Sequence, residues 1–395
     1  MKNGSKIIAL DALRGIAAII VVFHHFMLGF LPQYDGFLPG YDLKNTLIGN
    51  PLFFFLNGSA MVVIFFVLSG HVLSRRSFVN PDPAYIIGAV FKRWFRLFPL
   101  VLASVLISYV LFSANLYAFG DAAELSTSPW LGAFAYGGRH QGESVSLFSA
   151  LYQGFFDTFL TGHSSFNTNL WTMKYEFYGS MLTFLASLLF VFFRRWFVCI
   201  ILVIVVFLLK REPYYAAFLI GVFGTMASLE HLYLNPWMAA LLLVLGVYFC
   251  GFAIQGGAEV PVGAYSWIEH LHIKAEPGVL MGFFQIIGAF LFLIVFGTQN
   301  IVSRQFSGPV SRLLGQISFP LYLVHTLVIC SFSSIIYVRM NGTANGVVAA
   351  MVVLVFTLIP LVAALAWLDQ KWLKIIGDWH FPNKVLEKIS PYILK

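Results

Sequence analysis

The chain has 395 residues, of which 59% are hydrophobic and only 10% are charged. Soluble domains carry about 25% charged residues, and apolar runs of about 20 residues, long enough to cross a bilayer, recur here from end to end. The net charge of +7 comes from short Lys and Arg clusters between apolar runs, a pattern typical of membrane topology rather than of a nucleic-acid groove. The composition therefore excludes a soluble domain and a nucleic-acid partner, and predicts an all-α, polytopic integral membrane protein.

The apolar runs predict about ten transmembrane helices. They lie near residues 7–30, 52–73, 97–116, 170–193, 196–209, 214–230, 236–254, 279–299, 313–338 and 346–368. Between the third and fourth spans, the stretch "LFSALYQGFFDTFL" is interpreted as a re-entrant or surface helix. We expect one transmembrane domain over residues 1–370.

The Lys and Arg residues predict which ends of the spans face the cytoplasm. If the N-terminus is inside, most Lys and Arg fall in inner segments, among them the clusters at 75–76, 92–96 and 194–195. By the positive-inside rule, both termini are then cytoplasmic, in a multi-pass protein of the plasma (bacterial inner) membrane. Residues 371–395 alternate Trp and Lys with apolar residues, so we expect a cytoplasmic tail along the inner, lipid surface.

The first span, "LDALRGIAAIIVVFHHF", carries Asp11, Arg14, His24 and His25. A charge at the bilayer centre costs at least about 2.5–3.5 kcal/mol, so such residues point to function. Eleven helical steps of about 100° bring Arg14 and His25 to one face, about 16 Å apart along the axis. Asp11 can pair with Arg14 at i, i+3, and His24 points to another face. The alternative is a structural role, with Asp11–Arg14 as a buried ion pair and His25 as a packing residue.

Four further motifs place polar residues in or beside apolar spans. They are "FFVLSGHVLSRR" with Ser69, "FKRWFRLFPL" with Arg93 and Arg96, "NLWTMKYEFYGSM" with Glu176, and "ISFPLYLVHTLV" with Tyr322 and His325. Arg93 and Arg96 share a face at the mouth of the third span and could bind an anion, although Arg clusters also serve topology alone. The motifs of zinc proteases, P-loop proteins and serine hydrolases are missing from the sequence, and so is a metal-ligand cluster.

Together with the first span, these motifs resemble the acyltransferase 3 family of membrane-bound carbohydrate O-acyltransferases. The resemblance extends over about residues 7–368 and includes the family's signature of an Arg and a His eleven positions apart, here Arg14 and His25. It implies transfer of an acyl group, usually acetyl from acetyl-CoA, to a hydroxyl of a carbohydrate for the cell envelope or for export. Acyl-CoA would be the donor substrate, with no bound cofactor and no metal. One departure is His71, where the family usually has an aromatic residue.

The resemblance also implies roles for individual residues. His25 would be the general base, because imidazole titrates near neutral pH, or would form a covalent acyl intermediate. The donor-binding residues would be Arg14, Ser69, Arg93 and Arg96. Glu176 would orient His25 or an acceptor hydroxyl, and Tyr322 or His325 would donate to the oxyanion or contact the acceptor.

Two alternatives remain open from the sequence. An acyltransferase could use a lipid or a small metabolite as the acceptor, since the residues do not identify it. A transporter of acyl groups or sugar-lipids would also carry intramembrane Arg, Glu and His. Against a transporter, the chain shows no inverted repeat, and its inner Arg clusters suit a donor that carries phosphate.

Overall fold

The computed structural model describes residues 8–137, 145–255, 261–272 and 275–378. Within these ranges the regular structure is helical, apart from one isolated bridge between Tyr233 and Gln299. The predicted all-α class is confirmed. The part of the expected tail beyond residue 378 lies outside the described residues.

Seven helical segments of the described chain are long and apolar enough to cross a membrane. They are α1 (Ile8–Phe30), α3 (Gly58–Val79), α4 (Pro83–Ser113), α10 (Trp171–Phe192) with the preceding turn η4 (Thr168–Leu170), α14 (Pro277–Gly297), α16 (Pro309–Val328) with η7 (Ile329–Ser333) and α17 (Ser334–Arg339), and α18 (Ala344–Gly377). The other predicted spans correspond to the shorter helices α11 (Phe197–Leu209), α12 (Pro213–Met226) and α13 (Pro236–Cys250). These three are shorter than the roughly 20 residues that span a bilayer, so the count of ten spans stays a prediction.

Two helix boundaries differ from the sequence expectation in ways that affect the site. Helix α4 begins at Pro83, capped by Asp82, rather than near residue 97. Arg93 and Arg96 therefore lie within a helix and not at its mouth, because the polar residues that lower local hydropathy do not interrupt the backbone hydrogen bonds. Helix α18 continues to Gly377, so the expected domain boundary at residue 370 falls inside it.

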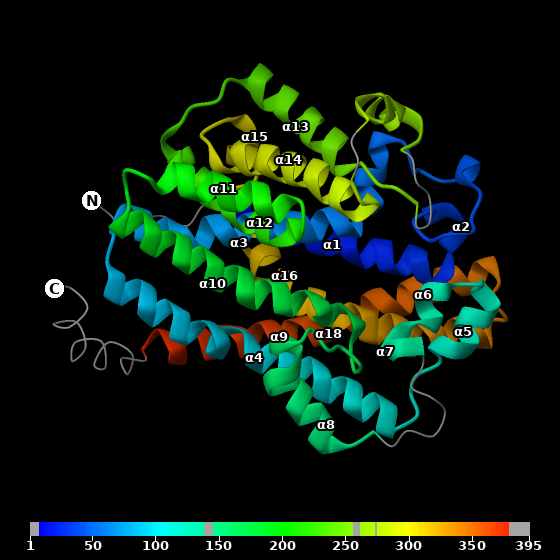
Figure 1. The fold of residues 1–395 in the computed structure, drawn as a ribbon. Coiled ribbons are helices and arrows are strands. Elements are labelled where there is room, and N and C mark those ends of the chain that lie inside the picture. Colours follow the sequence, from blue (N-terminus) through cyan, green and yellow to red (C-terminus); the bar gives the residue numbers. More distant parts are fainter. Residues whose placement is uncertain (1–7, 138–144, 256–260, 273–274, 379–395) are drawn as a thin grey trace.

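The long helices lie side by side, and several short ones gather at one end of the bundle, at the right of Figure 1. These are α2 (Pro32–Asp35), α5 (Phe119–Ser126), α6 (Pro129–Gly132) and α7 (Phe134–Gly137). The stretch expected to be a surface helix forms α8 (Leu147–Tyr152), the π-helical turn η3 (Gln153–Asp157) and α9 (Thr158–Leu160). The first two pack beside α4, and α9 packs beside α10. The remaining short elements are η1 (Leu43–Asn45), η2 (Pro51–Leu56), η5 (Leu229–His231), η6 (Gly263–Leu271) and α15 (Ile301–Gln305).

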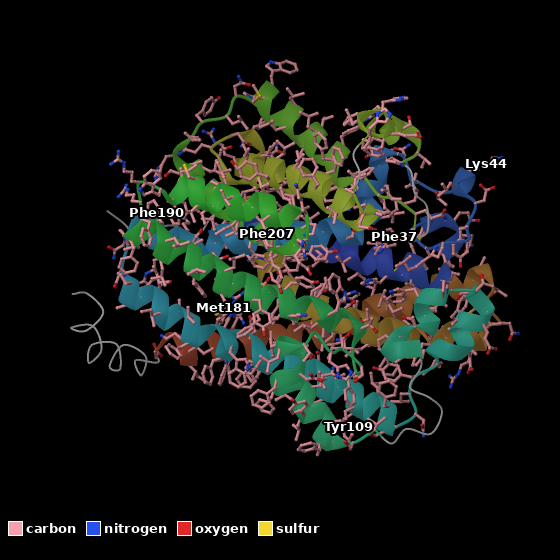
Figure 2. The ribbon with its side chains drawn as sticks, viewed as in Figure 1. Phe37, Lys44, Tyr109, Met181, Phe190 and Phe207 are labelled. Carbon is pink, nitrogen blue, oxygen red and sulfur yellow. The ribbon has the colours of Figure 1, made fainter. Side chains whose placement is uncertain are left out.

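Helices α1 and α16 pack closely along their length and run in the same direction. Near the start of both, Asp11 abuts Gly315, and near the end of both, His25 contacts His325. Large apolar side chains point outward from other helices, such as Phe207 on α11 (Figure 2), which is 61% exposed. That exposure is expected where the surrounding solvent is lipid.

Candidate active site

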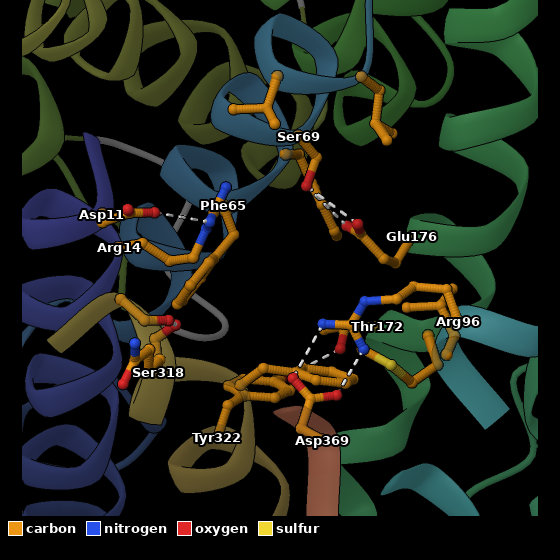
Figure 3. Close-up of a pocket in the computed structure, with 18 of the residues that line it drawn as sticks. Asp11, Arg14, Phe65, Ser69, Arg96, Thr172, Glu176, Ser318, Tyr322 and Asp369 are labelled. Carbon is orange, nitrogen blue, oxygen red and sulfur yellow. Dashed lines mark hydrogen bonds and ion pairs between the residues drawn. The ribbon is translucent and has the colours of Figure 1, made fainter. Parts of the chain in front are cut away.

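A cavity of about 330 Å³ lies among α1, α3, α4, α10, α16 and α18. Its polar lining consists of Asp11, Arg14, Ser69, Arg93, Arg96, Thr172, Glu176, Gln316, Ser318, Tyr322, Asp369 and Gln370, most of which appear in Figure 3. Aromatic and aliphatic side chains, including Phe65, Leu97 and Phe319, complete the wall. The cavity thus combines charged groups with an apolar surface.

Two of the arginines in the cavity pair with a carboxylate, one on the same helix and one on another helix. Arg14 lies 3.5 Å from Asp11, one turn earlier on α1, so the ion pair expected from their spacing is present. Arg96 forms a bidentate pair with Asp369 of α18, with nitrogen–oxygen distances of 2.7 and 3.1 Å. Such fork-to-fork contacts are geometrically specific, and this one ties α4 to the last turns of α18.

The third arginine of the cavity, Arg93, pairs with Glu176 of α10 and donates from Nε to Ser180 at 2.8 Å. Glu176 also accepts from the hydroxyl of Ser69, at 2.9 Å to one carboxylate oxygen and 3.3 Å to the other. Glu176 therefore holds Arg93 and Ser69. Glu176 does not contact His25 as expected, because the side chain of His325 lies beside His25 Nδ1 instead.

Tyr322 closes one end of the cavity. It is buried, and its hydroxyl lies 3.0 Å from the carbonyl oxygen of Asn169 and 2.8 Å from the hydroxyl of Thr172. The ring of Phe65 packs edge-on against it, with centroids 6.0 Å apart. An oxyanion would have to replace one of these hydrogen-bond partners to reach the Tyr322 hydroxyl.

His25 lies beyond Tyr322 and does not line the cavity. Its Nδ1 is 2.8 Å from Nε2 of His325, one turn after Tyr322 on α16. The ring of Trp130, from α6, lies nearly parallel to that of His25, with centroids 4.9 Å apart. His25 remains partly exposed, whereas His325 is fully buried.

His24 points away from this group, as the helix geometry predicted. Its Nδ1 lies 3.2 Å from the carboxylate of Asp35, which is fully buried. The other carboxylate oxygen of Asp35 accepts from the backbone N–H of Phe37 at 3.1 Å. His24 thus fixes the segment that follows α1.

Arg75 and Arg76, near the end of α3, lie outside the cavity lining. Arg75 pairs with Glu230 at 3.2 Å, and Arg76 lies over the ring of Tyr85 at 3.9 Å. Burial acts to raise the pKa of Glu230, but a backbone hydrogen bond and the charge of Arg75 hold that pKa below its ordinary value. These contacts give the pair a role in packing α3.

His71, the departure from the family pattern, lies fully buried between α3 and α12. Its Nδ1 is 3.0 Å from the hydroxyl of Thr225, which also donates to the backbone carbonyl of His71 at 3.0 Å. The substitution of an aromatic residue by His is therefore matched by a hydrogen-bond partner on the facing helix.

The structure brings six candidate residues into one cavity: Arg14, Ser69, Arg93, Arg96, Glu176 and Tyr322. It places His25 and His325 together just beyond it. Sequence reasoning missed the partners Asp369, Asn169, Thr172 and Trp130. Asp369 carried a signal, because it is a lone acid at the end of an apolar run.

Comparison with known proteins agrees with this reading of the motifs. Neither the curated proteins nor the solved structures compared with the chain gave a match. The family model of the acyltransferase domain, acyltransferase 3, matches residues 7–368. That match covers nearly the whole chain and every residue of the cavity up to the last turns of α18. The chain therefore belongs to the acyltransferase 3 family.

Proposed function

We propose that this membrane acyltransferase moves an acetyl group from cytoplasmic acetyl-CoA to a hydroxyl of a cell-envelope or exported carbohydrate. The observation that carries the proposal is the cavity with Arg14, Arg93 and Arg96, which ends at Tyr322 one helical turn from the His25–His325 pair. Arginine forks match phosphate oxygens, and the partly exposed ring of His25 can accept a proton from a hydroxyl that reaches it. The donor would thus bind in the cavity, and the acceptor hydroxyl would meet His25 just beyond it.

The donor would enter among the arginines. Arg14 and His25 are about 16 Å apart along α1, so the donor must be a long molecule, with its phosphates and its thioester at opposite ends. Acyl-CoA has this form. Its phosphates would replace the carboxylates that now pair with Arg93 and Arg96. Its pantetheine arm would lie against the apolar wall of Phe65, Leu97 and Phe319.

The reaction itself would be an attack by the acceptor hydroxyl on the thioester carbonyl. His25 removes the hydroxyl proton as the new carbon–oxygen bond forms. The carbon–sulfur bond then breaks, and the CoA thiolate leaves and takes up a proton. The products are an acetyl ester and CoA with a free thiol, so no oxidant or reductant is needed.

The proposed topology puts both termini in the cytoplasm and the protein in the plasma membrane. Its support is the distribution of Lys and Arg among the segments between spans. The short helices α2, α5, α6 and α7 then lie at the outer end of the bundle, near His25 and Trp130. The carbohydrate would approach from that end.

Thiol release from acetyl-CoA by the purified protein in detergent, with a soluble acceptor glycan, tests the proposal. We expect free CoA and an acetylated glycan, because an enzyme needs no membrane with two sides. Release should stop with His25→Ala. Arg96→Ala should raise the KM for acetyl-CoA, and Arg96→Lys should recover only part of the loss, since Lys lacks the bidentate fork.

A transporter would behave differently in this experiment. It would release no thiol in detergent, yet it would move its substrate across sealed vesicles. If acetyl appears on an added lipid or small metabolite and never on a glycan, the transfer chemistry stands and the carbohydrate acceptor is wrong.

A further inference from the structure

We propose that His325 is a positioning residue that fixes the tautomer of His25, and so determines which nitrogen of His25 acts as the base. The catalytic meaning of this inference rests on the proposed function, but the tautomer itself does not. Two hydrogen bonds of the described residues, both near the ends of α1 and α16, carry the argument.

The first observation is the contact between the two rings. His25 Nδ1 and His325 Nε2 are 2.8 Å apart, while the ring planes differ by only 10° and the centroids are 5.1 Å apart. The two nitrogens are close, but the ring centroids are far apart and the planes are nearly parallel. The rings therefore meet edge to edge and are not stacked. This is the geometry of a hydrogen bond directed along a lone pair. One nitrogen must therefore donate and the other accept.

The second observation decides which nitrogen of His325 carries a proton. His325 Nδ1 is 3.0 Å from the carbonyl oxygen of Leu321. A carbonyl oxygen only accepts, so Nδ1 must carry the hydrogen. A neutral imidazole has one N–H, which leaves Nε2 as an acceptor.

A further contact holds the ring of His325 in place. The side-chain amide nitrogen of Asn169 lies 3.1 Å from Nε2 and 3.4 Å from Nδ1 of His325, so it lies against the ring and points to neither nitrogen alone. The same nitrogen lies 3.2 Å from the carbonyl oxygen of Tyr322, which fixes it as the NH₂ group rather than the oxygen of the amide. The NH₂ group donates to Tyr322, and its contact with the His325 ring restrains the ring without deciding the tautomer.

It follows from the two hydrogen bonds that His25 donates from Nδ1 to His325. The hydrogen of a neutral His25 then lies on Nδ1, and its Nε2 is the basic nitrogen. In water histidine favours the opposite tautomer, with hydrogen on Nε2, so the protein must impose this one. The ring of Trp130 stacks on the face of the His25 ring, with centroids 4.9 Å apart, and restrains its orientation.

This arrangement also changes the expected role of His325. With its N–H bound to Leu321 and its lone pair bound to His25, it has no free hydrogen to offer an oxyanion. Its place matches the third group of a catalytic triad, which orients the base and does not itself react. Like that group, it would also receive the Nδ1–H bond of the imidazolium that forms when His25 takes a proton.

Nitrogen NMR of the full chain, labelled with ¹⁵N-histidine and held in lipid bilayers, tests the tautomer directly. The resonances of His25 are identified by their loss in His25→Gln. We expect a protonated Nδ1 and a bare Nε2 at neutral pH. A protonated Nε2 with a bare Nδ1 would overturn the inference, whether or not the protein proves to be an acyltransferase.

Two amide variants of the partner test the role in transfer. His325→Gln can place an oxygen where Nε2 now lies and accept from His25, whereas His325→Asn reaches only the position of Nδ1. We expect Asn to lower kcat by about 100-fold or more with the KM for acetyl-CoA nearly unchanged, and Gln to restore most of kcat. Asn should also return His25 to the tautomer with hydrogen on Nε2.

Equal rates for the Gln and Asn variants, or a change confined to KM, would overturn the positioning role. If wild-type protein transfers no acyl group while its His25 carries hydrogen on Nδ1, the proposed function fails and the tautomer stands. If neither variant folds, the wild-type spectrum still decides whether His25 donates to His325.

Discussion

At the scale of single residues, the two adjacent histidines of α1 show how one helical step separates two tasks. A step of about 100° directs His25 toward His325 and Trp130, and His24 toward Asp35. His25 keeps a partly exposed ring, while the carboxylate that binds His24 is fully buried. The first can meet a substrate, and the second can only hold structure.

We therefore expect His24→Ala to lower stability rather than to remove transfer from the protein that remains folded. Loss of one partner leaves a buried polar group without its hydrogen bond, which costs about 1–3 kcal/mol. The midpoint of thermal unfolding in detergent measures this. The double variant His24→Ala/Asp35→Ala should lose less than the two single losses added together. A His24→Ala protein as stable as wild type would contradict the pairing.

The sequence predicted the local part of this site and missed the distant part. Asp11, Arg14 and His25 lie on one helix, so helix geometry alone placed the ion pair and separated His25 from His24. The partner of His25 is 300 positions away, and that of Arg96 is 273 positions away. No periodicity relates such residues, since their contact depends on how the helices pack.

At the scale of elements, the helices were predicted better than their ends. Hydropathy marks where apolar residues lie, and polar residues that face a protein cavity interrupt that pattern without ending the helix. Helix α4 thus begins at Pro83 rather than near 97, and α18 continues past Asp369 to Gly377. Both stretches supply polar residues to the cavity. Those residues lower the local hydropathy, so the sequence pattern predicted a loop and a tail there.

The close packing of α1 against α16 gives a prediction at the same scale. A Cβ added at Gly315 would lie 2.4 Å from the Cβ of Asp11, and neither atom can move without its helix. We expect Gly315→Ala to cost about 1–3 kcal/mol by overpacking and to reduce transfer by separating His25 from His325. Thermal unfolding and initial rates measure the two effects.

Gly278 is the matched control for this change. It also lies in a helix, α14, but a Cβ there would meet nothing within 4 Å. Gly278→Ala should leave stability and rate close to wild type. Equal behaviour of the two alanine variants would mean that the α1–α16 contact does not position the site.

At the scale of the whole molecule, the cavity and His25 occupy successive positions along the bundle, which predicts a sided reaction. Acetyl-CoA, the donor proposed above, is too polar to cross a bilayer, so it would have to reach the arginines from the cytoplasm. In sealed right-side-out vesicles loaded with acetyl-CoA, an impermeant glycan outside should become acetylated. Mass spectrometry of the recovered glycan measures it. Modification only of glycan enclosed inside would place both substrates on the cytoplasmic side.

The layer formed by Tyr322, Thr172 and Phe65 at the end of the cavity has an electrical consequence. Each elementary charge that crosses a membrane releases about 2.3 kcal/mol per 100 mV, so an open passage from the cavity to His25 would discharge the cell. In the resting protein the Tyr322 hydroxyl is bonded to Asn169 and Thr172, and the ring of Phe65 packs against it. In the proposed reaction, the uncharged acetyl end of the donor would pass this layer when its side chains shift, whereas a hydrated ion would lose its water there. The side chains that end the cavity would then insulate the membrane while a chemical group moved through it.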